Sequence, residues 1–466
     1  MAERTHTDPE RMEKIVSFCK SKGFIYQSGE LYGGLNGCWD YGPLGAELKR
    51  NLKDYWWRKN VQERDDIVGM DGSILTHQAV LTASGHVGGF SDPMVDCKVC
   101  KKRYRADQID DLPMCEGKKQ LPKGEDKHCE LTEPKEFNLM FQTKMGASAD
   151  DDDPNAVAYL RPETAQTIFV QYKNVLDSTR QKIPFGIAQI GKAFRNEINP
   201  RNFTFRSREF EQMEIEYFCH PDDGMKLTDE WLERRLKFYE EIGVPRAKLH
   251  ILDVPDGERA HYSKKTYDIE YEFPFGIQEL EGVAYRTDYD IGKHLEHSGK
   301  TLEYFNPETT ERYIPHVVEP SAGCDRTVLA ILCEAYDEED LTKEGGKTDI
   351  RKVMRFKSCM APIKVAVLPL LKNKPELVAK AKEVKALLQP HMNVFYDEAA
   401  AIGRRYRRQD EVGTPFCVAI DFETLGEESE NGEDLTDTVT IRHRDSMEQE
   451  RIAISELLPW LLARIV

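Results

Sequence analysis

The stretch Phe194–Glu214, FRNEINPRNFTFRSREFEQME, decides the fold of this chain. Apolar runs flank it, Ile187–Ile190 before and Ile215–Phe218 after, and predict two strands joined by a polar loop. Such a strand pair carries arginines, a carboxylate and an aromatic ring at fixed offsets, and these groups can hold a bent nucleotide. A solvated hairpin with cross-strand ion pairs would contain the same residue types. Further motifs must therefore decide between the two interpretations.

Composition excludes several classes of protein. A length of 466 residues predicts more than one domain, and 40% hydrophobic residues suffice for a large core. No run of 18 apolar residues is present, which predicts no membrane span, and the polar segment Met1–Pro9 predicts no secretory signal. We therefore expect a cytoplasmic protein whose 11 cysteines are reduced or bind metal. The net charge of −17 disfavours general nucleic-acid binding, although a local basic face can still bind RNA.

The pattern of elements predicts an α+β protein with two domains. Residues 1–345 are expected to form the first domain. Two segments of it look like insertions: residues 92–155 are rich in Cys and Lys and then acidic, and residues 222–257 are charged, amphipathic and helical. Residues 346–361 are predicted to be a linker. From 362 to 466 strands alternate with helices, which is typical of a small α/β domain, and its last helix is expected at Glu448–Leu458.

A basic run lies on a predicted helix of the second domain. Its arginines are Arg404, Arg405, Arg407 and Arg408, with Tyr406 between them. Arginines and aromatic rings bind splayed single-stranded bases, so the run is a candidate RNA contact. A solvated helix face explains the same pattern equally well.

Four cysteines of the first insertion have the spacing of metal ligands. Cys97 and Cys100 form a C-x-x-C pair, and Cys115 and Cys129 follow singly, the latter beside His128. Four thiolates suit a tetrahedral structural Zn²⁺. The alternative is a reduced loop with a chance C-x-x-C.

Three further blocks carry the remaining signal. Val318–Arg326, VEPSAGCDR, places an arginine at the start of a predicted helix, where an anion is favoured. Phe194–Glu214 resembles motif 2 of the class II aminoacyl-tRNA synthetases, and Val318–Arg326 resembles motif 3. The blocks Leu160–Gln166, LRPETAQ, and Glu279–Asp290, ELEGVAYRTDYD, make the resemblance more specific. Shorter matches are found at Tyr32–Leu35, Asp40–Gly45, Ala83–His86 and Phe137–Phe141. Over nearly its whole length the chain resembles the homodimeric glycyl-tRNA synthetases.

That resemblance implies an antiparallel-sheet class II catalytic domain followed by an α/β anticodon-binding domain. It implies a glycine–tRNA ligase that converts glycine and ATP to glycyl-adenylate and pyrophosphate, then transfers glycine to the 3′ end of tRNA(Gly). It also implies Mg²⁺ as cofactor and a homodimer, with no membrane partner. The alternatives are a non-catalytic, nucleic-acid-binding relative and a class IIa ligase for another amino acid. The first should have lost the motif arginines and carboxylates, and the second lacks the R-P-E-T and E-L-E-G blocks.

The resemblance also assigns roles to single residues. The ATP set is Arg195 at the α-phosphate, Glu197 at the adenine amine, Phe210 under the ring, and Arg206 and Arg326 at the outer phosphates, with Arg195 and Arg326 counted as catalytic. The Mg²⁺ ligands are Glu279 and Glu319, which also belong to the ATP site. The glycine set is Arg286 at the carboxylate and Glu163, Glu214 and Ser321 at the ammonium group.

Physical chemistry agrees with glycine as the substrate. A hydrophobic pocket rejects a ligand one methylene smaller by only about 1–3 kcal/mol. Glycine has no smaller competitor, so exclusion of larger side chains by shape suffices and no editing domain is needed. Attack of a carboxylate on the α-phosphorus requires alignment and charge neutralisation, so we expect no catalytic His or Cys.

Overall fold

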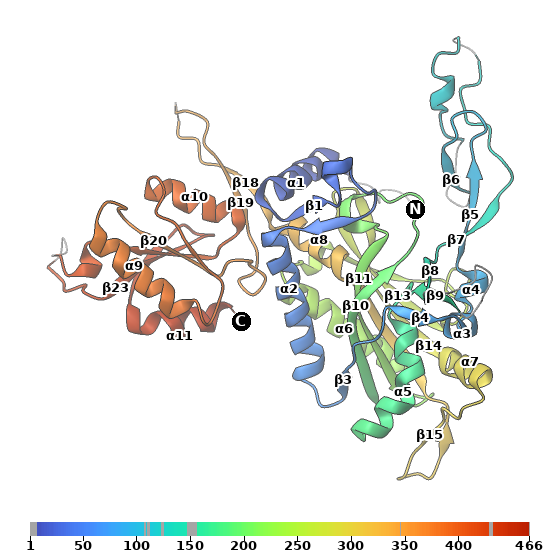
Figure 1. The fold of residues 1–466 in the computed structure, drawn as a ribbon. Helices are drawn as coiled ribbons and strands as arrows, with labels where there is room; N and C mark the ends of the chain where they lie inside the picture. Colours follow the sequence, from blue (N-terminus) through green and yellow to red (C-terminus); the bar gives the residue numbers. More distant parts are fainter. Residues whose placement is uncertain are drawn as a thin grey trace.

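A seven-stranded sheet forms the centre of the N-terminal domain in the computed structural model, which describes residues 7–106, 109, 112–122, 125–146, 156–344, 346–427 and 432–465 (Figure 1). In spatial order its strands are β12 (Leu249–Asp253), β13 (Lys265–Phe273), β14 (Gly276–Thr287), β17 (His316–Gly323), β11 (Glu209–Cys219), β10 (Phe185–Phe194) and β3 (Ile67–Gly69). Every neighbouring pair is antiparallel except β10 and β3, which are parallel. The predicted strand pair around Phe194–Glu214 is β10 and β11, at the centre of this sheet.

Residues 222–257, predicted as an insertion, belong to the core of this domain. They form α6 (Gly224–Glu241), which packs on β14 and β17, and the edge strand β12. Trp231 and Tyr239 of α6 are buried against the sheet. The charged residues that made the segment look independent are the solvent face of an amphipathic helix.

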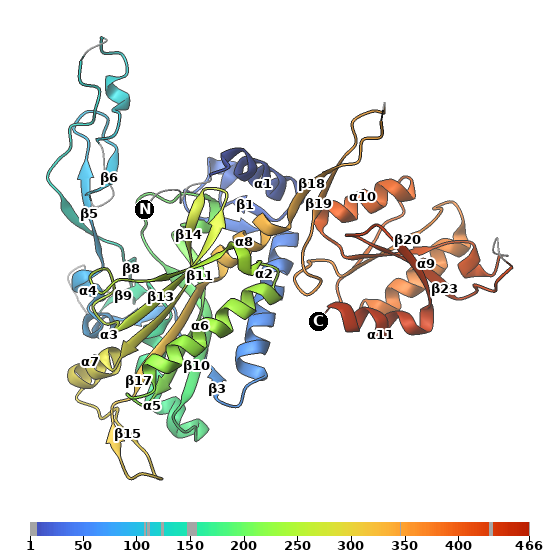
Figure 2. The same ribbon diagram turned by 180° about the vertical axis from the view of Figure 1, so that it is seen from behind.

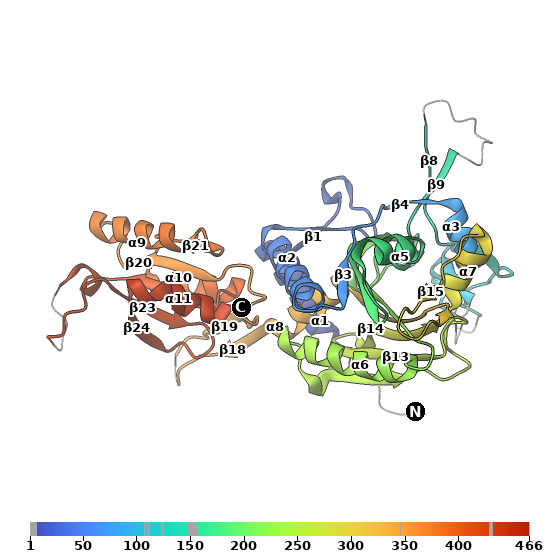
Figure 3. The same ribbon diagram turned by 90° about the horizontal axis from the view of Figure 1, so that it is seen from below.

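Helices cover both faces of the sheet (Figures 1 and 3). Ile215 and Tyr217 of β11 point into the core shared with α6 and α8 (Cys324–Ala335). Phe218, on the opposite face, packs in a second cluster with α5 (Ala165–Thr179) and α7 (Tyr289–Ser298). Because strand side chains alternate, the even-numbered residues of β11 share this second face. The remaining core helices are α1 (Pro9–Lys22) and α2 (Pro43–Trp57), the latter continued by a π-helical turn, Arg58–Gln62.

The cysteine-rich insertion projects away from the body of the domain (Figures 1 and 2). It contains a three-stranded sheet, β6-β5-β7, and a second sheet, β4-β9-β8, lies at its base. Their strands are β4 (Leu75–His77), β5 (Ser91–Asp96), β6 (Arg103–Arg105), β7 (Lys135–Asn138), β8 (Gln142–Lys144) and β9 (Val157–Leu160). Smaller elements are β1 (Ile25–Gln27), β2 (Trp39–Tyr41), α3 (Gln78–Ala83), α4 (His86–Gly89), β15 (Tyr304–Phe305) and β16 (Arg312–Tyr313). Residues 147–155 of the predicted insertion lie outside the described residues.

The C-terminal domain is a five-stranded mixed sheet with helices packed against it. Its strand order is β21 (Val394–Tyr396), β20 (Val365–Pro369), β22 (Phe416–Ile420), β23 (Thr438–His443) and β24 (Gln449–Ala453), and its helices are α9 (Pro375–Leu388), α10 (Ile402–Val412) and α11 (Ile454–Ile465). The helix predicted at Glu448–Leu458 is wrong in its first half. Residues 449–453 pair with β23 instead, and the final helix begins only at Ile454. Pairing at an open sheet edge overrides a weak local helix preference.

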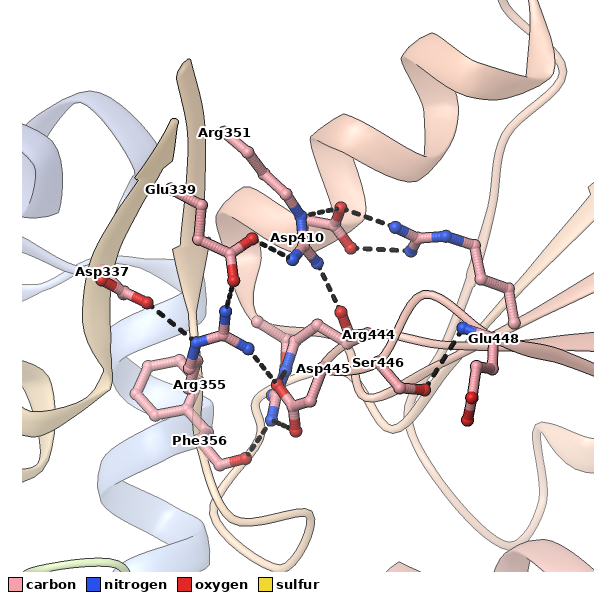
Figure 4. A network of polar contacts seen from close by, with 12 residues as sticks. Asp337, Glu339, Arg351, Arg355, Phe356, Asp410, Arg444, Asp445, Ser446 and Glu448 are labelled. Carbon is pink, nitrogen blue, oxygen red and sulfur yellow. Dashed lines mark hydrogen bonds and ion pairs between the residues drawn. The ribbon is translucent and has the colours of Figure 1, made fainter. Parts of the chain in front are cut away.

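The predicted linker, residues 346–361, is partly a strand. Residues Ile350–Met354 form β19, which pairs with β18 (Tyr336–Asp340) in a hairpin directly after α8. Figure 4 shows how buried charges fasten this hairpin to the C-terminal domain. Arg351 is fully buried and donates to Asp410 of α10 at 2.9 Å and to Glu339 of β18 at 2.6 Å. Among the described residues, no helix is long and apolar enough to cross a membrane.

Candidate active site

A cavity of about 380 Å³ opens on the face of the sheet that carries the even-numbered residues of β11. Every residue that the sequence assigns to ATP or glycine lines it. These are Glu163, Arg195, Glu197, Arg206, Phe210, Glu214, Glu279, Arg286, Glu319, Ser321 and Arg326. The residues come from β11, β14, β17 and α8 and from the loops before α5 and between β10 and β11. The fold therefore gathers positions up to 163 residues apart (326 − 163) into one site.

The loop between β10 and β11 is built around Phe205. Its ring packs edge-on against Phe273 and Phe275 at centroid distances of 5.3 and 5.2 Å. Asn202 and Phe203 have φ of +58°, a conformation that Asn tolerates better than most residues. This tight turn brings the guanidinium of Arg206 within 3.9 Å of the Glu197 carboxylate, and both side chains line the cavity.

Two arginines form the cationic end of the cavity. The Nε of Arg195 donates to the carbonyl of Pro162 at 3.1 Å, and its guanidinium lies 5.4 Å from the ring centre of Phe210. Arg326, in the first turn of α8, donates from Nε to the Phe205 carbonyl at 3.2 Å. Its Nη1 lies 3.3 Å from the carboxylate of Glu279. Cations held at fixed positions in a cleft suit a polyphosphate.

The other end of the cavity is an acidic cup, defined as the carboxylates of Glu163, Glu214 and Glu319 with the hydroxyl of Ser321. Glu214 and Ser321 are register partners on β11 and β17, and the Ser321 hydroxyl donates to Glu214 at 2.7 Å. A second hydroxyl, that of Thr164, also donates to Glu214. Burial, followed by repulsion from Glu319 and Glu163, raises the pKa of Glu214 to about 8. The cup therefore crowds carboxyl groups together, and a bound cation would favour their ionisation.

Glu163 carries its charge more easily than Glu214. Burial opposes its ionisation, but His86 at 3.4 Å, Arg286 and the amide of Gln166 at 3.1 Å outweigh burial, so its pKa is lowered. Burial likewise lowers the pKa of His86, but Glu163 outweighs that effect and the net shift is upward. We therefore expect an ionised Glu163 facing a less readily ionised Glu214.

Arg286 closes the floor of the cup. Its Nη1 donates to Glu319 at 2.5 Å, and its Nε and Nη2 bind the two oxygens of Asp290 at 2.8 and 3.0 Å. The ring of Tyr262 lies 3.9 Å from its guanidinium carbon. Arg286 therefore balances two buried carboxylates in addition to any contact with substrate.

Glu279 and Glu319, both expected to bind Mg²⁺, lie far apart along the sheet. Glu319 lies opposite Ala284, and Glu279 is five residues further along β14 (284 − 279), about 16 Å at 3.3 Å per residue. Glu319 instead lies with Glu214 and Glu216, and one carboxylate oxygen of each of the three lies within 4.8 Å of the other two. Glu279 has a half-exposed carboxylate beside Arg326, where it can supply one oxygen to a hydrated Mg²⁺ on a nucleotide.

The cysteine cluster has the dimensions of a zinc site. The four Sγ atoms of Cys97, Cys100, Cys115 and Cys129 lie within 4.8 Å of one another, and two of the pairs are 3.8 Å apart. A tetrahedron with Zn–S bonds of about 2.3 Å has edges of about 3.8 Å. The ring of His128 binds Asp126 at 2.8 Å instead of joining the cluster. All 11 cysteines are free thiols.

The basic run on α10 does not form one surface. Arg405 is buried and donates to the carbonyls of Pro369 and Leu370, so its prediction as an RNA contact is wrong. Helical periodicity turns this position toward β20. Arg407 pairs with Asp349 at 2.9 Å and Arg408 pairs with Asp397, while Arg404 is exposed.

Several residues of the site are absent from the sequence-based assignment. Glu216 follows Glu214 by two positions, so strand periodicity alone would place it on the same face. Asp290 follows Arg286 by four positions, and the two pair across the junction between β14 and α7. His86 and Glu163 are 77 residues apart (163 − 86), and no local pattern links them.

Comparison with known proteins defines the class first. Residues 142–335 match the family model of the tRNA synthetase class II core domain (G, H, P, S and T), and residues 364–464 match that of the anticodon binding domain. The chain is thus a class II tRNA synthetase. It is 52% identical to a glycine–tRNA ligase of Treponema denticola (96% of this chain, 95% of that protein), 49% to one of Clostridium perfringens (96% and 97%) and 47% to one of Thermus thermophilus (97% and 99%). The chain belongs to the glycine–tRNA ligase family.

Proposed function

We propose that this chain ligates glycine to tRNA with the cavity as its active site, divided between an ATP end and a glycine end. One observation carries the proposal: a single cavity joins a cleft lined with arginines to the acidic cup. The cleft suits a polyphosphate, and the cup suits a small ammonium group. An α-amino acid, whose carboxylate and ammonium group share one carbon, would then have its carboxylate between the two ends.

In the proposed first step, a glycine carboxylate oxygen attacks the α-phosphorus of ATP and pyrophosphate leaves. Arg195 neutralises charge at the α-phosphate, and Arg206 and Arg326 hold the outer phosphates. Glu197 accepts a hydrogen bond from the adenine amine while Phe210 stacks on the ring. Class II synthetases generally use Mg²⁺ with ATP; Glu279 would supply an oxygen ligand to it, and the ion would screen the phosphate charge.

The acidic cup positions the amino acid. Glu163, Glu214 and Ser321 surround the ammonium group, and Glu319 adds charge from the floor. Arg286 has five N–H donors, three of which serve Asp290 and Glu319, so the remaining donors are available to the substrate carboxylate. In the second step, a ribose hydroxyl at the tRNA 3′ end attacks the adenylate carbonyl and AMP leaves. Alignment and charge neutralisation supply the acceleration.

The test of this proposal is ATP–pyrophosphate exchange. We expect exchange only when glycine is added, and Arg195→Ala should reduce the rate about 10²–10³-fold, the usual loss of one donor to developing charge. Lys192→Ala is the matched control, because Lys192 lies on the same hairpin, is half exposed and pairs only with Glu209 among the described residues. Exchange with another amino acid but not with glycine would refute the substrate. Near-normal exchange by Arg195→Ala would refute the residue's role.

A structural zinc ion in the cysteine cluster is part of the proposal. Four thiolates complete a tetrahedral shell, so the ion would stabilise the insertion and take no part in the reaction. Metal analysis of the purified protein should find zinc, and Cys115→Ser should reduce its amount. Cys38→Ser is the matched control, because Cys38 lies outside the cluster. Equal zinc in both variants would contradict this assignment.

We also propose a homodimer that charges tRNA(Gly) in the cytoplasm. The loop after β1 exposes Leu31, Tyr32 and Leu35 by 88%, 90% and 57%, an apolar patch suited to a protein contact. Arg404 is the exposed arginine of α10 and remains a candidate tRNA contact together with Arg407 and Arg408. Light scattering on the purified chain tests the dimer, and a monomeric mass at assay concentration would contradict it.

A further inference from the structure

Asp325 is a buried aspartate whose carboxylate binds groups from other parts of the fold. It lies in the first turn of α8, directly before Arg326, and the N-cap residue of that helix is Gly323, without a side-chain cap. The helix dipole favours a carboxylate in a first turn, which by itself would explain an aspartate there. The carboxylate nevertheless accepts hydrogen bonds from three other elements, so the dipole does not account for its position alone.

The three donors come from β2, α2 and β11. Oδ1 of Asp325 accepts from the hydroxyl of Tyr41 at 2.6 Å and from Nζ of Lys49 at 2.7 Å. Oδ2 accepts from the backbone amide of Glu211 at 2.7 Å. The pairing of β17 with β11 ends opposite Gln212, so the Asp325 side chain takes the place of a strand partner for the next amide of β11. The carboxylate therefore joins the start of α8 to the central sheet and to the N-terminal elements.

The charges around Asp325 are balanced within the protein. Nζ of Lys49 also lies 2.7 Å from one carboxylate oxygen of Glu211, and Lys53 pairs with the other oxygen at 3.0 Å. The side chains of Lys49, Glu211 and Asp325 are each 13% exposed or less. Two carboxylates thus face two ammonium groups at short range, which is the condition for a buried ion pair to hold a fixed geometry. This cluster differs in that respect from the acidic cup.

The D-Y-G-P-L-G block of the sequence builds one side of this anchor. Tyr41 ends β2, and Lys49 lies on α2 one turn after Gly45. A Cβ on Gly45 would lie 1.8 Å from the carbonyl oxygen of Phe24, so only glycine lets α2 pack this closely. Tyr41 and Lys49 lie outside the lining of the ATP–glycine cavity. Any effect of theirs on nucleotide kinetics must therefore pass through the side chains that they hold.

The anchor lies between two residues of the ATP end. Arg326 follows Asp325 in the chain, and its guanidinium lies 4.5 Å from the ring centre of Phe205 and donates to the carbonyl of Glu279 at 3.2 Å. Phe210 directly precedes the residue whose amide Asp325 accepts. One hydrogen bond therefore fixes the residue placed at the outer phosphates relative to the residue placed under the adenine ring.

We propose that Asp325 is a positioning residue for ATP, which sets the spacing between Arg326 and Phe210 while Tyr41 and Lys49 hold it in place. Adenylate formation requires the α-phosphorus to be aligned with the attacking carboxylate, and a displacement of about 1 Å can cost about 10²-fold in rate. The inference rests on the proposed role of Arg326 at the outer phosphates.

Asp325→Asn keeps the size of the side chain and removes its charge. In glycine-dependent pyrophosphate exchange, kcat/KM for ATP should fall about 10–10²-fold, whereas the glycine KM should stay within about twofold, because the anchor lies at the ATP end. Asp410→Asn is the control, since it also leaves buried arginines without their carboxylate, but in the C-terminal domain, and its ATP kinetics should be unchanged. Equal losses for ATP and glycine in Asp325→Asn would indicate a general loss of folded enzyme and overturn the proposal.

Tyr41→Phe covers the case in which Asp325→Asn does not fold. It removes one hydroxyl and keeps the ring, over which Nζ of Lys49 lies at 4.4 Å. The loss of one hydrogen bond to a charged group should lower kcat/KM for ATP about three- to tenfold. Tyr55→Phe is the matched control, because Tyr55 of α2 also donates to a carboxylate, that of Glu241 at 3.1 Å. ATP kinetics in Tyr41→Phe as unchanged as in the control would overturn the proposal.

A double-mutant cycle tests whether Asp325 acts through Arg326. Arg326→Ala should slow exchange about 10²–10³-fold, and the further change Asp325→Asn should then cost less than about threefold. Fully additive losses would overturn the proposed route. Near-normal exchange by Arg326→Ala would refute its role in the proposed function and this inference with it. Normal exchange by Asp325→Asn beside an impaired Arg326→Ala would overturn the inference alone.

Discussion

Two buried clusters of charge in this molecule differ in how completely their charges are matched. The Arg351–Asp410 network, made up of Arg351, Asp410, Arg442 and Glu339, joins the β18–β19 hairpin to the C-terminal domain. Figure 4 shows Arg351, Asp410 and Glu339 of this network. Asp410 accepts from Arg442 at 2.9 and 3.1 Å and from Arg351 at 2.9 Å. Each guanidinium therefore has a carboxylate partner within the protein.

The acidic cup is matched only in part. Its three glutamates, at positions 163, 214 and 319, lie beside Glu216 at a site where Arg286 is shared with Asp290. The pKa values of Glu214, Glu216 and Glu319 are all raised, with burial as the largest cause. A matched cluster has completed its interactions and holds the domains together. A cluster whose carboxyl groups lack enough cationic partners within the protein can bind a cationic ligand group, and such shifted pKa values are common at functional sites.

The largest expected effect comes from removing a carboxyl group from the cup. Glu214→Ala should lower kcat/KM for glycine about 10²–10³-fold, because it removes a buried partner of the ammonium group, a change that costs about 3–5 kcal/mol. The KM for ATP should change little, since Glu214 belongs to the glycine end. Pyrophosphate exchange at varied glycine and ATP measures both. Glu209→Ala, on the exposed end of the same strand, is the control, and equal losses for both substrates would contradict the division of the cavity.

Removing charge from the Arg351–Asp410 network should affect stability instead. Asp410→Ala leaves Arg351 and Arg442 buried without their partner, which costs about 3–5 kcal/mol. Urea unfolding should show this loss in the transition of the C-terminal domain, while the glycine KM stays the same. Asp437→Ala removes an exposed partner of Lys380 and should cost about 1 kcal/mol or less. A comparable loss of stability in Asp410→Ala and Asp437→Ala would contradict the expectation that the buried ion pairs contribute more to stability than the exposed one.

The cup should also give stability a particular dependence on pH. The pKa of Glu214 is raised to about 8, so the folded state keeps this proton while the unfolded state releases it near about pH 4.3. The folded state then binds more protons between these values, and the free energy of unfolding falls as pH rises through the window. Glu214→Gln removes this term, so its melting temperature should gain on that of the original protein as pH rises toward about 8.

Glu211→Gln, on the same strand, should change the pH dependence of stability in the opposite direction. Burial raises the pKa of Glu211, but Lys49 and Lys53 outweigh burial and lower it overall. Its contribution to stability is therefore present above the unfolded pKa and lost in acid. Glu211→Gln should destabilise the protein at neutral pH, and this deficit should shrink as pH falls. If the stabilities of Glu214→Gln and Glu211→Gln depended on pH in the same way, the opposite directions assigned to the two pKa shifts would be contradicted.

The smallest effect is expected at the surface of α10. Arg404→Ala should raise the KM for tRNA about threefold, the order of one exposed ionic contact, and leave unfolding unchanged. Arg405→Ala should do the reverse, because its guanidinium holds the carbonyls of Pro369 and Leu370. Aminoacylation at varied tRNA, with urea unfolding, separates the two. An unchanged tRNA KM in Arg404→Ala would contradict a tRNA contact at Arg404, the arginine of this run that has no carboxylate partner among the described residues.

Much of the nucleotide end could be predicted from local sequence. Arg195, Glu197, Arg206 and Phe210 lie within one strand–loop–strand unit, so their spacing already defines which side chains meet. The C-terminal strands and helices were predictable for the same reason, since hydrophobic periodicity reports which face is buried. The segment at 222–257 was misjudged because an amphipathic helix has the same pattern whether it covers a sheet or stands apart.

The sequence by itself determined the class of protein, the strand pair that forms the ATP end and the glutamates that make the glycine end acidic. Tertiary structure alone decided how those charges are distributed. Register placed Glu319 opposite Glu216 and away from Glu279, and helix orientation buried Arg405. The physical reason is that the residue type specifies only which charge a side chain can carry. Burial and the nearest opposite charge are both set by distant parts of the chain, and they decide whether that charge is paired, neutralised or available to a ligand.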